Sequence, residues 1–244
     1  MAADASTGTA VLVTAAVLAG QLSIGWSNDL IDVARDRATG RRDKPLVSDG
    51  VSERIVLTAC RLALVACVVL SLACGWRAGL VHLGCVAAGW AYNLGVKSTL
   101  WSWLPYAVAF GFLPVFVSLA ADGTDAGDAT ALPWWVAVAA ALVGVGAHFV
   151  NAVPDLADDA ATGVRGLPHR LGARPATVLA VALLASATLV VVLASSVRGT
   201  GVGWAGVGVV LVLSGVALIG RGRTPFQAAI AVALVDVAML AWAL

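Results

Sequence analysis

Long apolar stretches recur along the chain, separated by short polar connections. Eight of them are predicted to form helices, over residues 8–27, 54–74, 78–96, 102–120, 133–153, 175–196, 202–220 and 226–244. About twenty apolar residues in a helix cross the roughly 30 Å hydrocarbon core of a bilayer. Strands of a membrane β-barrel would instead alternate apolar and polar residues, and these continuous runs do not. The pattern therefore predicts an all-α, polytopic membrane bundle with about eight transmembrane helices.

The composition narrows the class of protein further. Of the 244 residues, 60% are hydrophobic and only 12% are charged, which is more apolar than a soluble domain requires. The connections are short except at 28–53, 121–132 and 154–174, so we expect a single transmembrane domain over residues 1–244. The net charge is +1 and no basic run suggests nucleic-acid binding, so we expect no nucleic-acid partner. Nothing in the sequence indicates an obligate protein partner.

Lysine and arginine are distributed unevenly between the connections. The connections after the first, third, fifth and seventh apolar stretches hold twelve of them, whereas those after the second, fourth and sixth hold two. Loops rich in lysine and arginine stay on the cytoplasmic side of a membrane. The count predicts an integral, multi-pass protein of the cell membrane whose odd-numbered connections face the cytoplasm.

The same polar pattern occurs at the ends of the first and fifth apolar stretches. NDLIDVARDRATGRRDKP begins at Asn28, and NAVPDLADDAATGVRGLP begins at Asn151. A shift of 123 residues makes nine of the eighteen positions identical, without a gap. A packing repeat would retain apolar volume rather than Asn, Asp and Arg, so the repetition indicates a duplicated functional device.

The polar residues of each copy are spaced to share one face of a helix. They follow an i, i+4, i+8 pattern with a further carboxylate beside it: Asn28, Asp29, Asp32 and Asp36, then Asn151, Asp155, Asp158 and Asp159. Several carboxylates within two turns repel one another, most strongly near a low-dielectric boundary. Mg²⁺ takes hard oxygen ligands and commonly bridges one or two carboxylates to substrate phosphates. The spacing therefore favours Mg²⁺ as the cofactor.

A less specific interpretation of these residues stays open. The aspartates could pair with neighbouring basic residues in an ordinary solvated loop. Two copies in matched register on one predicted membrane face favour the functional interpretation. In that case, basic residues such as Arg35, Arg42 and Lys44 would neutralise phosphate oxygens that the metal leaves exposed.

A third polar segment, YNLGVKST, ends the third apolar stretch. Tyr92 lies at its start, and Lys97 is the single basic residue of that connection. A tyrosine and a lysine at a membrane boundary can simply anchor a helix at the interface. They also lie on the predicted membrane face that carries both aspartate motifs. A functional role is therefore as well supported as an anchoring role.

Together these residues resemble the UbiA superfamily of intramembrane prenyltransferases. The run from Asn28 to Asp36, followed by RRDKPL, is similar to the first aspartate-rich motif of that superfamily. Asp155 and Asp159, with the downstream LPHRLG, are similar to the second motif, and Tyr92 with Lys97 is similar to its tyrosine–lysine loop. The order of the motifs agrees as well, so the resemblance covers nearly the whole chain.

The resemblance implies Mg²⁺-dependent transfer of a prenyl group from a polyprenyl diphosphate to a lipid-soluble acceptor, aromatic or a quinone precursor, within the membrane. It implies metal binding by Asp29, Asp32, Asp36, Asp155 and Asp159. It implies diphosphate binding by Asn28, Arg42, Lys97, Asn151 and Arg165. The implied catalytic residues are Asp32, Asp155, Lys97 and Tyr92, with Tyr92 orienting the leaving group or facing the allylic cation.

The number of helices departs from the family pattern. Members usually have nine helices, and the first motif ends the second of them. Here the motif ends the first apolar stretch, so the first family helix is expected to be missing.

Other functions would use some of the same residues. Within the superfamily, a terpene cyclase or a phosphoribosyl transferase acting on a polyprenyl phosphate would need the same aspartate motifs. A secondary transporter with a carboxylate ion site is the alternative from another class. Transporter sites lie near the midplane of the membrane, however, whereas these carboxylates cluster at one boundary.

Overall fold

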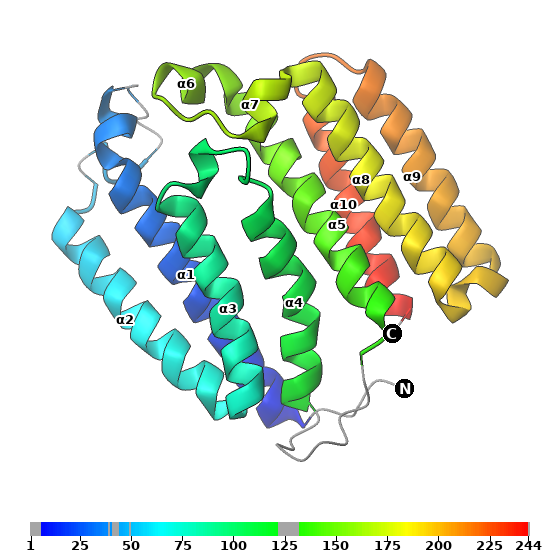
Figure 1. The fold of residues 1–244 in the computed structure, drawn as a ribbon, viewed down its shortest axis with the longest axis horizontal. Helices are drawn as coiled ribbons and strands as arrows, with labels where there is room; N and C mark the ends of the chain where they lie inside the picture. Colours follow the sequence, from blue (N-terminus) through cyan, green and yellow to red (C-terminus); the bar gives the residue numbers. More distant parts are fainter. Residues whose placement is uncertain (1–5, 39, 41–43, 49, 122–131, 244) are drawn as a thin grey trace. The chain divides into compact units, whose positions relative to one another are not determined.

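The structure is a computed structural model that describes residues 6–38, 40, 44–48, 50–121 and 132–243, and these residues form helices without strands. Eight long helices occur in this part of the chain: α1 (Thr7–Ala38), α2 (Glu53–Ala73), α3 (Trp76–Asn93), α4 (Leu104–Ala121), α5 (Trp134–Ala152), α8 (Ala173–Ala194), α9 (Gly201–Ile219) and α10 (Thr224–Ala243) (Figure 1). Shorter helices lie between them: η1 (Val96–Ser98), η2 (Val153–Asp155), α6 (Leu156–Ala161), α7 (Leu167–Leu171) and η3 (Ser196–Gly199). The predicted all-α class is confirmed.

Seven helical segments in the described residues are long and apolar enough to cross a membrane, one of them running from α5 through α6. The eighth predicted span, residues 78–96, corresponds to α3, which is not among the seven. Arg77 stands at its first turn, His82 in its middle and Asn93 at its end, and these residues lower its hydropathy. The prediction of about eight transmembrane helices thus agrees with the eight long helices of the described residues, although α3 is less apolar than the rest.

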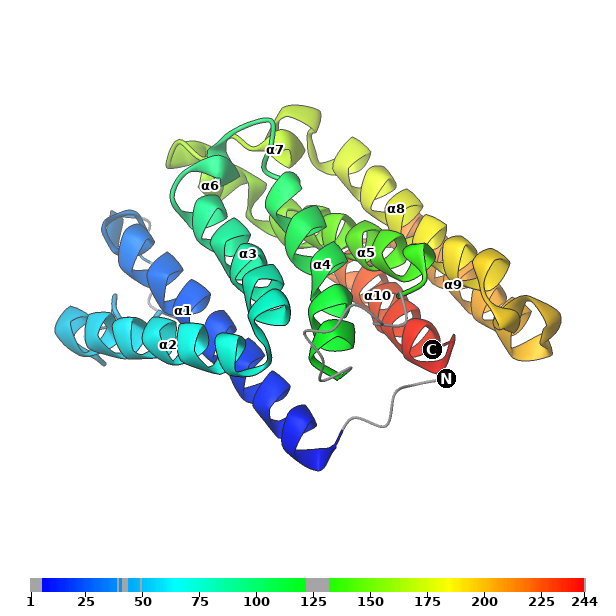
Figure 2. The same cartoon turned by 60° about the horizontal axis from the view of Figure 1, so that its bottom comes forward.

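The chain divides into two compact units. Among the described residues, the first unit contains those within 6–96 and 115–121, and the second contains 97–114 and 132–243. In the first unit, α1, α2 and α3 pack together, with Cys67 and Val86 in their shared core. In the second unit, α5, α8, α9 and α10 pack together around Phe149, Leu184 and Val232 (Figure 2).

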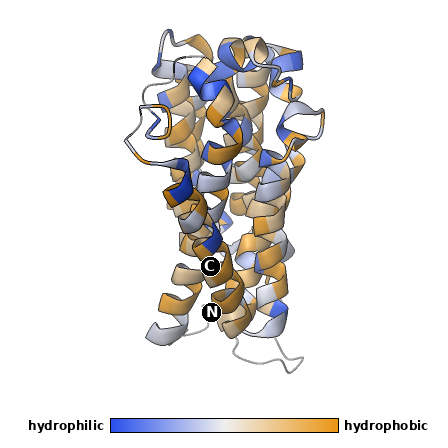
Figure 3. Ribbon diagram, turned by 90° about the vertical axis from the view of Figure 1, so that its left-hand side faces the viewer, coloured by the Kyte–Doolittle hydropathy of each residue, from blue (hydrophilic) through white to orange (hydrophobic). Residues whose placement is uncertain are grey.

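Large apolar side chains also cover the outside of the helices. Leu62 of α2, Val212 of α9 and Leu234 of α10 expose 65%, 68% and 65% of their surface. Figure 3 shows apolar residues over most of the length of the helices. Soluble proteins rarely expose so many large apolar side chains, because water does not solvate them favourably. The helices are therefore suited to a hydrocarbon environment.

The two repeated segments end in the same way although they fold differently. α1 continues without a break through the first aspartate motif to Ala38, whereas Pro154 interrupts the second motif within η2. Gly40 and Gly163, which correspond in the repeat, both have left-handed φ angles, of 68° and 86°. Each follows a helix end, where this conformation is easily adopted by glycine. The shared Ala-Thr-Gly of the repeat therefore includes a helix stop signal.

Candidate functional site

The first aspartate motif lies on the last turns of α1, in the first unit. Asp32 and Asp36 are buried, with exposures of 4% and 5%, while Asn28 and Asp29 are half-buried. The predicted single helical face is therefore present, because α1 remains helical through all four positions. Buried carboxylates need compensating charges or hydrogen bonds.

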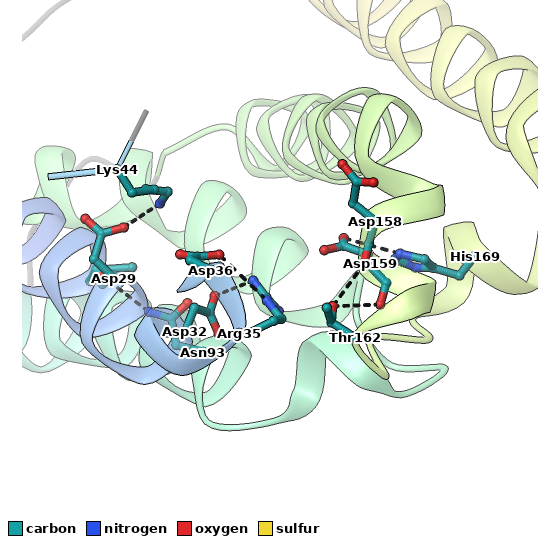
Figure 4. Close-up of polar contacts among 11 residues, drawn as sticks. Asp29, Asp32, Arg35, Asp36, Lys44, Asn93, Asp158, Asp159, Thr162 and His169 are labelled. Atoms are coloured by element: carbon teal, nitrogen blue, oxygen red, sulfur yellow. Dashed lines mark hydrogen bonds and ion pairs between the residues drawn. The ribbon is translucent and has the colours of Figure 1, made fainter. Parts of the chain in front are cut away.

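Basic side chains of the same segment supply part of that compensation. An Arg35 guanidinium nitrogen lies 2.7 Å from an Asp32 carboxylate oxygen, and Arg35 Nε lies 3.9 Å from Asp36. The Lys44 ammonium lies 2.5 Å from Asp29 (Figure 4). The pairing of aspartates with neighbouring bases, the less specific interpretation, is thus realised in part. These ion pairs offset part of the repulsion between the carboxylates. The repulsion therefore does not by itself require a metal ion, contrary to the inference from the spacing.

A polar contact from α3 holds α1 one turn before the motif. The Asn93 amide nitrogen donates hydrogen bonds of 2.8 Å to the Ile24 carbonyl and to Ser27 Oγ. Trp90 Nε1 donates one of 3.2 Å to Ser23 Oγ. These bonds fix the rotation of α1 about its axis, and therefore the direction in which the following carboxylates point. The predicted polar segment after residue 92 thus includes Asn93 as a positioning residue.

The second motif is divided between three elements of the second unit. Asn151 lies in the last turn of α5, Asp155 ends η2, and Asp159 lies in α6. They do not share one continuous helical face, contrary to the prediction, because the Pro154 ring cannot continue the helical hydrogen bonding. The interruption at Pro154 separates these side chains into two groups.

Asn151 and Asp155 line a groove of about 1440 Å³ within the second unit. Segments from η2, α8, α9 and the start of α10 form its walls. Two arginines, Arg174 and Arg223, also line it, together with Gln227 and with apolar residues that include Val153, Val178, Leu218 and Phe226. The groove therefore combines hydrogen-bonding and cationic groups with an apolar wall.

Asp159 belongs to a different contact. One oxygen of its carboxylate lies 3.3 Å from Nε2 of His169, whose side chain is only 7% exposed (Figure 4). Thr162 Oγ1 donates hydrogen bonds of 3.1 and 3.0 Å to the carbonyls of Asp158 and Asp159. The contact between Asp159 and His169 ties α7 to α6.

The remaining predicted residues are found in several places. Tyr92 is half-buried in the last turn of α3, in the first unit, and Lys97 is buried in η1, in the second. Arg165 is exposed, and its carbonyl accepts a 3.2 Å hydrogen bond from Arg170. Arg42 lies outside the described residues.

Oxygen donors dominate both motifs, which suits Mg²⁺. Among the described residues, no three His, Cys, Asp or Glu side chains gather closely enough to hold a metal ion by themselves. Mg²⁺ characteristically takes only one or two protein carboxylates and completes its octahedron with water and phosphate oxygens. Asp155 with Asn151 on the groove wall offers a donor set of this kind.

Sequence reasoning counted Arg174 and Arg223 only as positive charges on one predicted side of the membrane. Their convergence on the groove depends on how α8 and α10 pack, which no local pattern reveals. Ser102 and His148, which hydrogen-bond to each other, were likewise not singled out as partners. The sequence shows only that each is a polar residue on a separate apolar stretch. This does not identify which polar residues form a contact in the fold.

Comparisons with known proteins identify the family of the chain. The profile of the UbiA prenyltransferase family matches residues 1–243. The bacteriochlorophyll synthase 33 kDa chain of Cereibacter sphaeroides is 34% identical over 191 residues, which cover 72% of this chain and 60% of that protein. The match thus spans less than two thirds of that relative's length.

Two solved structures have the same fold. A UbiA homologue from Aeropyrum pernix K1 superposes with a TM-score of 0.80 at 21% identity, covering 97% of this chain and 90% of the other. A UbiA homologue from Archaeoglobus fulgidus, bound to GPP and Mg²⁺, gives a TM-score of 0.72 at 19% identity, covering 98% and 89%. With its apolar helices, the chain is an integral membrane protein, and it belongs to the UbiA prenyltransferase family.

Proposed function

We propose that the protein transfers a prenyl group from a prenyl diphosphate to a lipid-soluble acceptor, with Mg²⁺ as cofactor. The groove of the second unit carries this proposal, since it places Asp155 and Asn151 beside two arginines and an apolar wall. A phosphorylated lipid has complementary chemistry, with an anionic head and an apolar chain. The relative from Archaeoglobus fulgidus bound to GPP and Mg²⁺ supports the same substrate class.

The residues of the groove have distinct tasks in this reaction. Asp155 and Asn151 would hold Mg²⁺, which when bound supplies positive charge to the diphosphate as the carbon–oxygen bond breaks. Arg174 and Arg223 contact the phosphate oxygens and neutralise the charge that the leaving group gains. The apolar wall keeps water away from the allylic cation until the acceptor's nucleophile attacks and loses its proton.

The other motif residues complete this assignment. Asp29, Asp32 and Asp36 would form the second metal-binding segment, with Asn28 beside them, and Lys97, Arg42 and Arg165 would contact the diphosphate. Tyr92 would orient the leaving group or face the cation. The distribution of lysine and arginine supports a cytoplasmic location for the motif-bearing connections.

Release of inorganic pyrophosphate from allylic diphosphates tests this function. Purified protein is incubated with geranyl, farnesyl or geranylgeranyl diphosphate, with Mg²⁺ or with a chelator, and with or without aromatic acceptors. We expect release that requires both Mg²⁺ and an acceptor. Release without an acceptor, with a cyclic hydrocarbon product, would indicate a terpene cyclase instead. No release from any of these diphosphates in the presence of Mg²⁺ and acceptors would contradict the proposal.

The two groove arginines provide a more specific prediction. Replacing both Arg174 and Arg223 by glutamine should raise the KM for the prenyl diphosphate about tenfold or more, because charge-assisted hydrogen bonds to phosphate are lost. Arg198→Gln is the matched control, since Arg198 lies in η3 beyond the other end of α8. An unchanged KM in the double variant would remove the arginines from the site.

A further inference from the structure

A buried hydroxyl in the second unit joins three segments that carry proposed functional residues. Ser102 is completely buried. Its Oγ accepts a 3.0 Å hydrogen bond from the backbone N–H of Leu167 and shares a 3.0 Å hydrogen bond with Nε2 of His148. Ser102 itself follows the η1 turn that contains Lys97. The hydroxyl therefore connects the lysine turn, α5 and the beginning of α7.

Each of these segments continues to a residue of the proposed site. His148 lies three residues before Asn151 on α5, and the groove begins there. Leu167 is the first residue of α7, which carries His169 to the Asp159 carboxylate. A short helix has unpaired backbone N–H groups at its start, and the Ser102 hydroxyl satisfies one of them.

The lysine turn is also in direct backbone contact with the loop after the second motif. A Cβ atom added to Gly166 would lie 2.5 Å from the Lys97 carbonyl oxygen and 2.9 Å from Ser102 Oγ. Only glycine permits this approach without movement of the backbone. Gly166 has an ordinary extended φ of −64°, so the close packing, and not the backbone conformation, requires the glycine.

We propose that Ser102, together with His148 and Gly166, is a positioning cluster that sets Lys97 and the second aspartate motif in the geometry that binds the diphosphate. This inference rests on the proposed function. None of the three residues need touch the substrate. Their effect is transmitted through the turn at Lys97, the end of α5 and the start of α7, all of which they contact or adjoin.

The aromatic surroundings of His148 explain why its ring can act as a fixed partner. The ring contacts those of Tyr106 and Phe149, with centroid separations of 4.8 and 5.4 Å. Rings held in this way have little rotational freedom. The packed His148 ring therefore fixes the orientation of the Ser102 hydroxyl through their hydrogen bond. That hydroxyl in turn fixes the first residue of α7.

The test compares variants that remove the hydrogen bonds with one that preserves them. Ser102→Ala, His148→Leu and Gly166→Ala should each raise the KM for farnesyl diphosphate at least about fivefold, while His148→Gln, which can still hydrogen-bond, should recover most of the affinity. Inhibition by inorganic pyrophosphate with Mg²⁺ should weaken by a similar factor. Thermal unfolding in detergent measures stability in the same samples.

A second buried polar pair serves as the control for a purely structural effect. Thr188 of α8 donates a hydrogen bond to Asp236 of α10, and both are buried in the same unit. Thr188 is fifteen residues along α8 from Ala173, roughly 22 Å from the groove end of that helix. Thr188→Val should lower the unfolding temperature without raising the KM. Matching KM changes in Thr188→Val and Ser102→Ala would overturn the positioning role.

Failure of this inference is distinguishable from failure of the proposed function. If the wild-type protein releases no pyrophosphate, the function fails, and the positioning role is then decided by direct calorimetric binding of inorganic pyrophosphate with Mg²⁺. Binding that is equal in wild type and Ser102→Ala, or absent from wild type, would overturn the inference. Binding weakened in Ser102→Ala and recovered in His148→Gln relative to His148→Leu supports it.

Discussion

Replacing Asp155 by asparagine is expected to lower the rate of pyrophosphate release by about a hundredfold to a thousandfold. Asp155 is exposed on the wall of the groove, which Asn151 also lines, and among the described residues it is the one carboxylate of that wall. The substitution keeps the size of the side chain but removes the negative charge that attracts Mg²⁺. Losses of this size follow removal of one group that stabilises developing charge in a transition state.

The neighbouring acid Asp158 provides the control for this substitution. Asp158 is also exposed and is drawn near Asp159 in Figure 4, but it does not line the groove. Asp158→Asn should leave the rate within about twofold of wild type, since an exposed charge that does not line the groove is screened by water and contributes little. The assignment would be wrong if Asp155→Asn retained activity, or if the two variants lost activity equally.

Replacing Asp32 by asparagine is expected to cause a comparable loss of activity together with a small loss of stability. Asp32 is buried, and its carboxylate lies 2.7 Å from the Arg35 guanidinium. Asparagine has no charge, so Arg35 would keep only a weaker partner. The free energy of unfolding should fall by about 1 kcal/mol, the size of a typical ion-paired hydrogen bond that is partly solvated. The rate of pyrophosphate release should fall by about a hundredfold or more.

An exposed ion pair in the same unit separates the two effects. Arg37 lies 2.9 Å from Glu53, and both side chains are 49% exposed. Glu53→Gln breaks this pair at a position outside the motif and should change neither the rate nor the stability appreciably. If Asp32→Asn lost stability but kept the wild-type rate, Asp32 would be a structural residue that only restrains Arg35.

Hydropathy located the apolar part of nearly every helix. The predicted spans 54–74 and 202–220 differ by one residue at each end from α2 and α9. The prediction for 8–27 stopped eleven residues before the end of α1, because hydropathy marks the apolar segment of a helix and not its hydrogen bonding. The i, i+3 contact between Asp32 and Arg35 helps to continue α1 beyond its apolar part.

The composition of the site was partly predictable, and its arrangement was not. The repeat identified Asp32 and Asp155 because acidic residues at matched positions are unusual in an apolar chain. It did not reveal that Asp159 faces His169, because this contact requires α7 to fold back onto α6. The convergence of Arg174 and Arg223 depends in the same way on tertiary packing. Local spacing determines which residues share a helical turn, whereas contacts between turns depend on the whole bundle.

The central claim is that binding of a prenyl diphosphate depends on both Asp32 and Asp155, the matched acids of the repeat. Calorimetric titration with the unreactive analogue farnesyl thiodiphosphate, in the presence of Mg²⁺, tests it in wild type, Asp32→Asn and Asp155→Asn. The account predicts one binding site per chain, whose affinity falls about tenfold or more in each single variant. Unchanged affinity in either variant, or two independent sites of which each variant loses one, would contradict it.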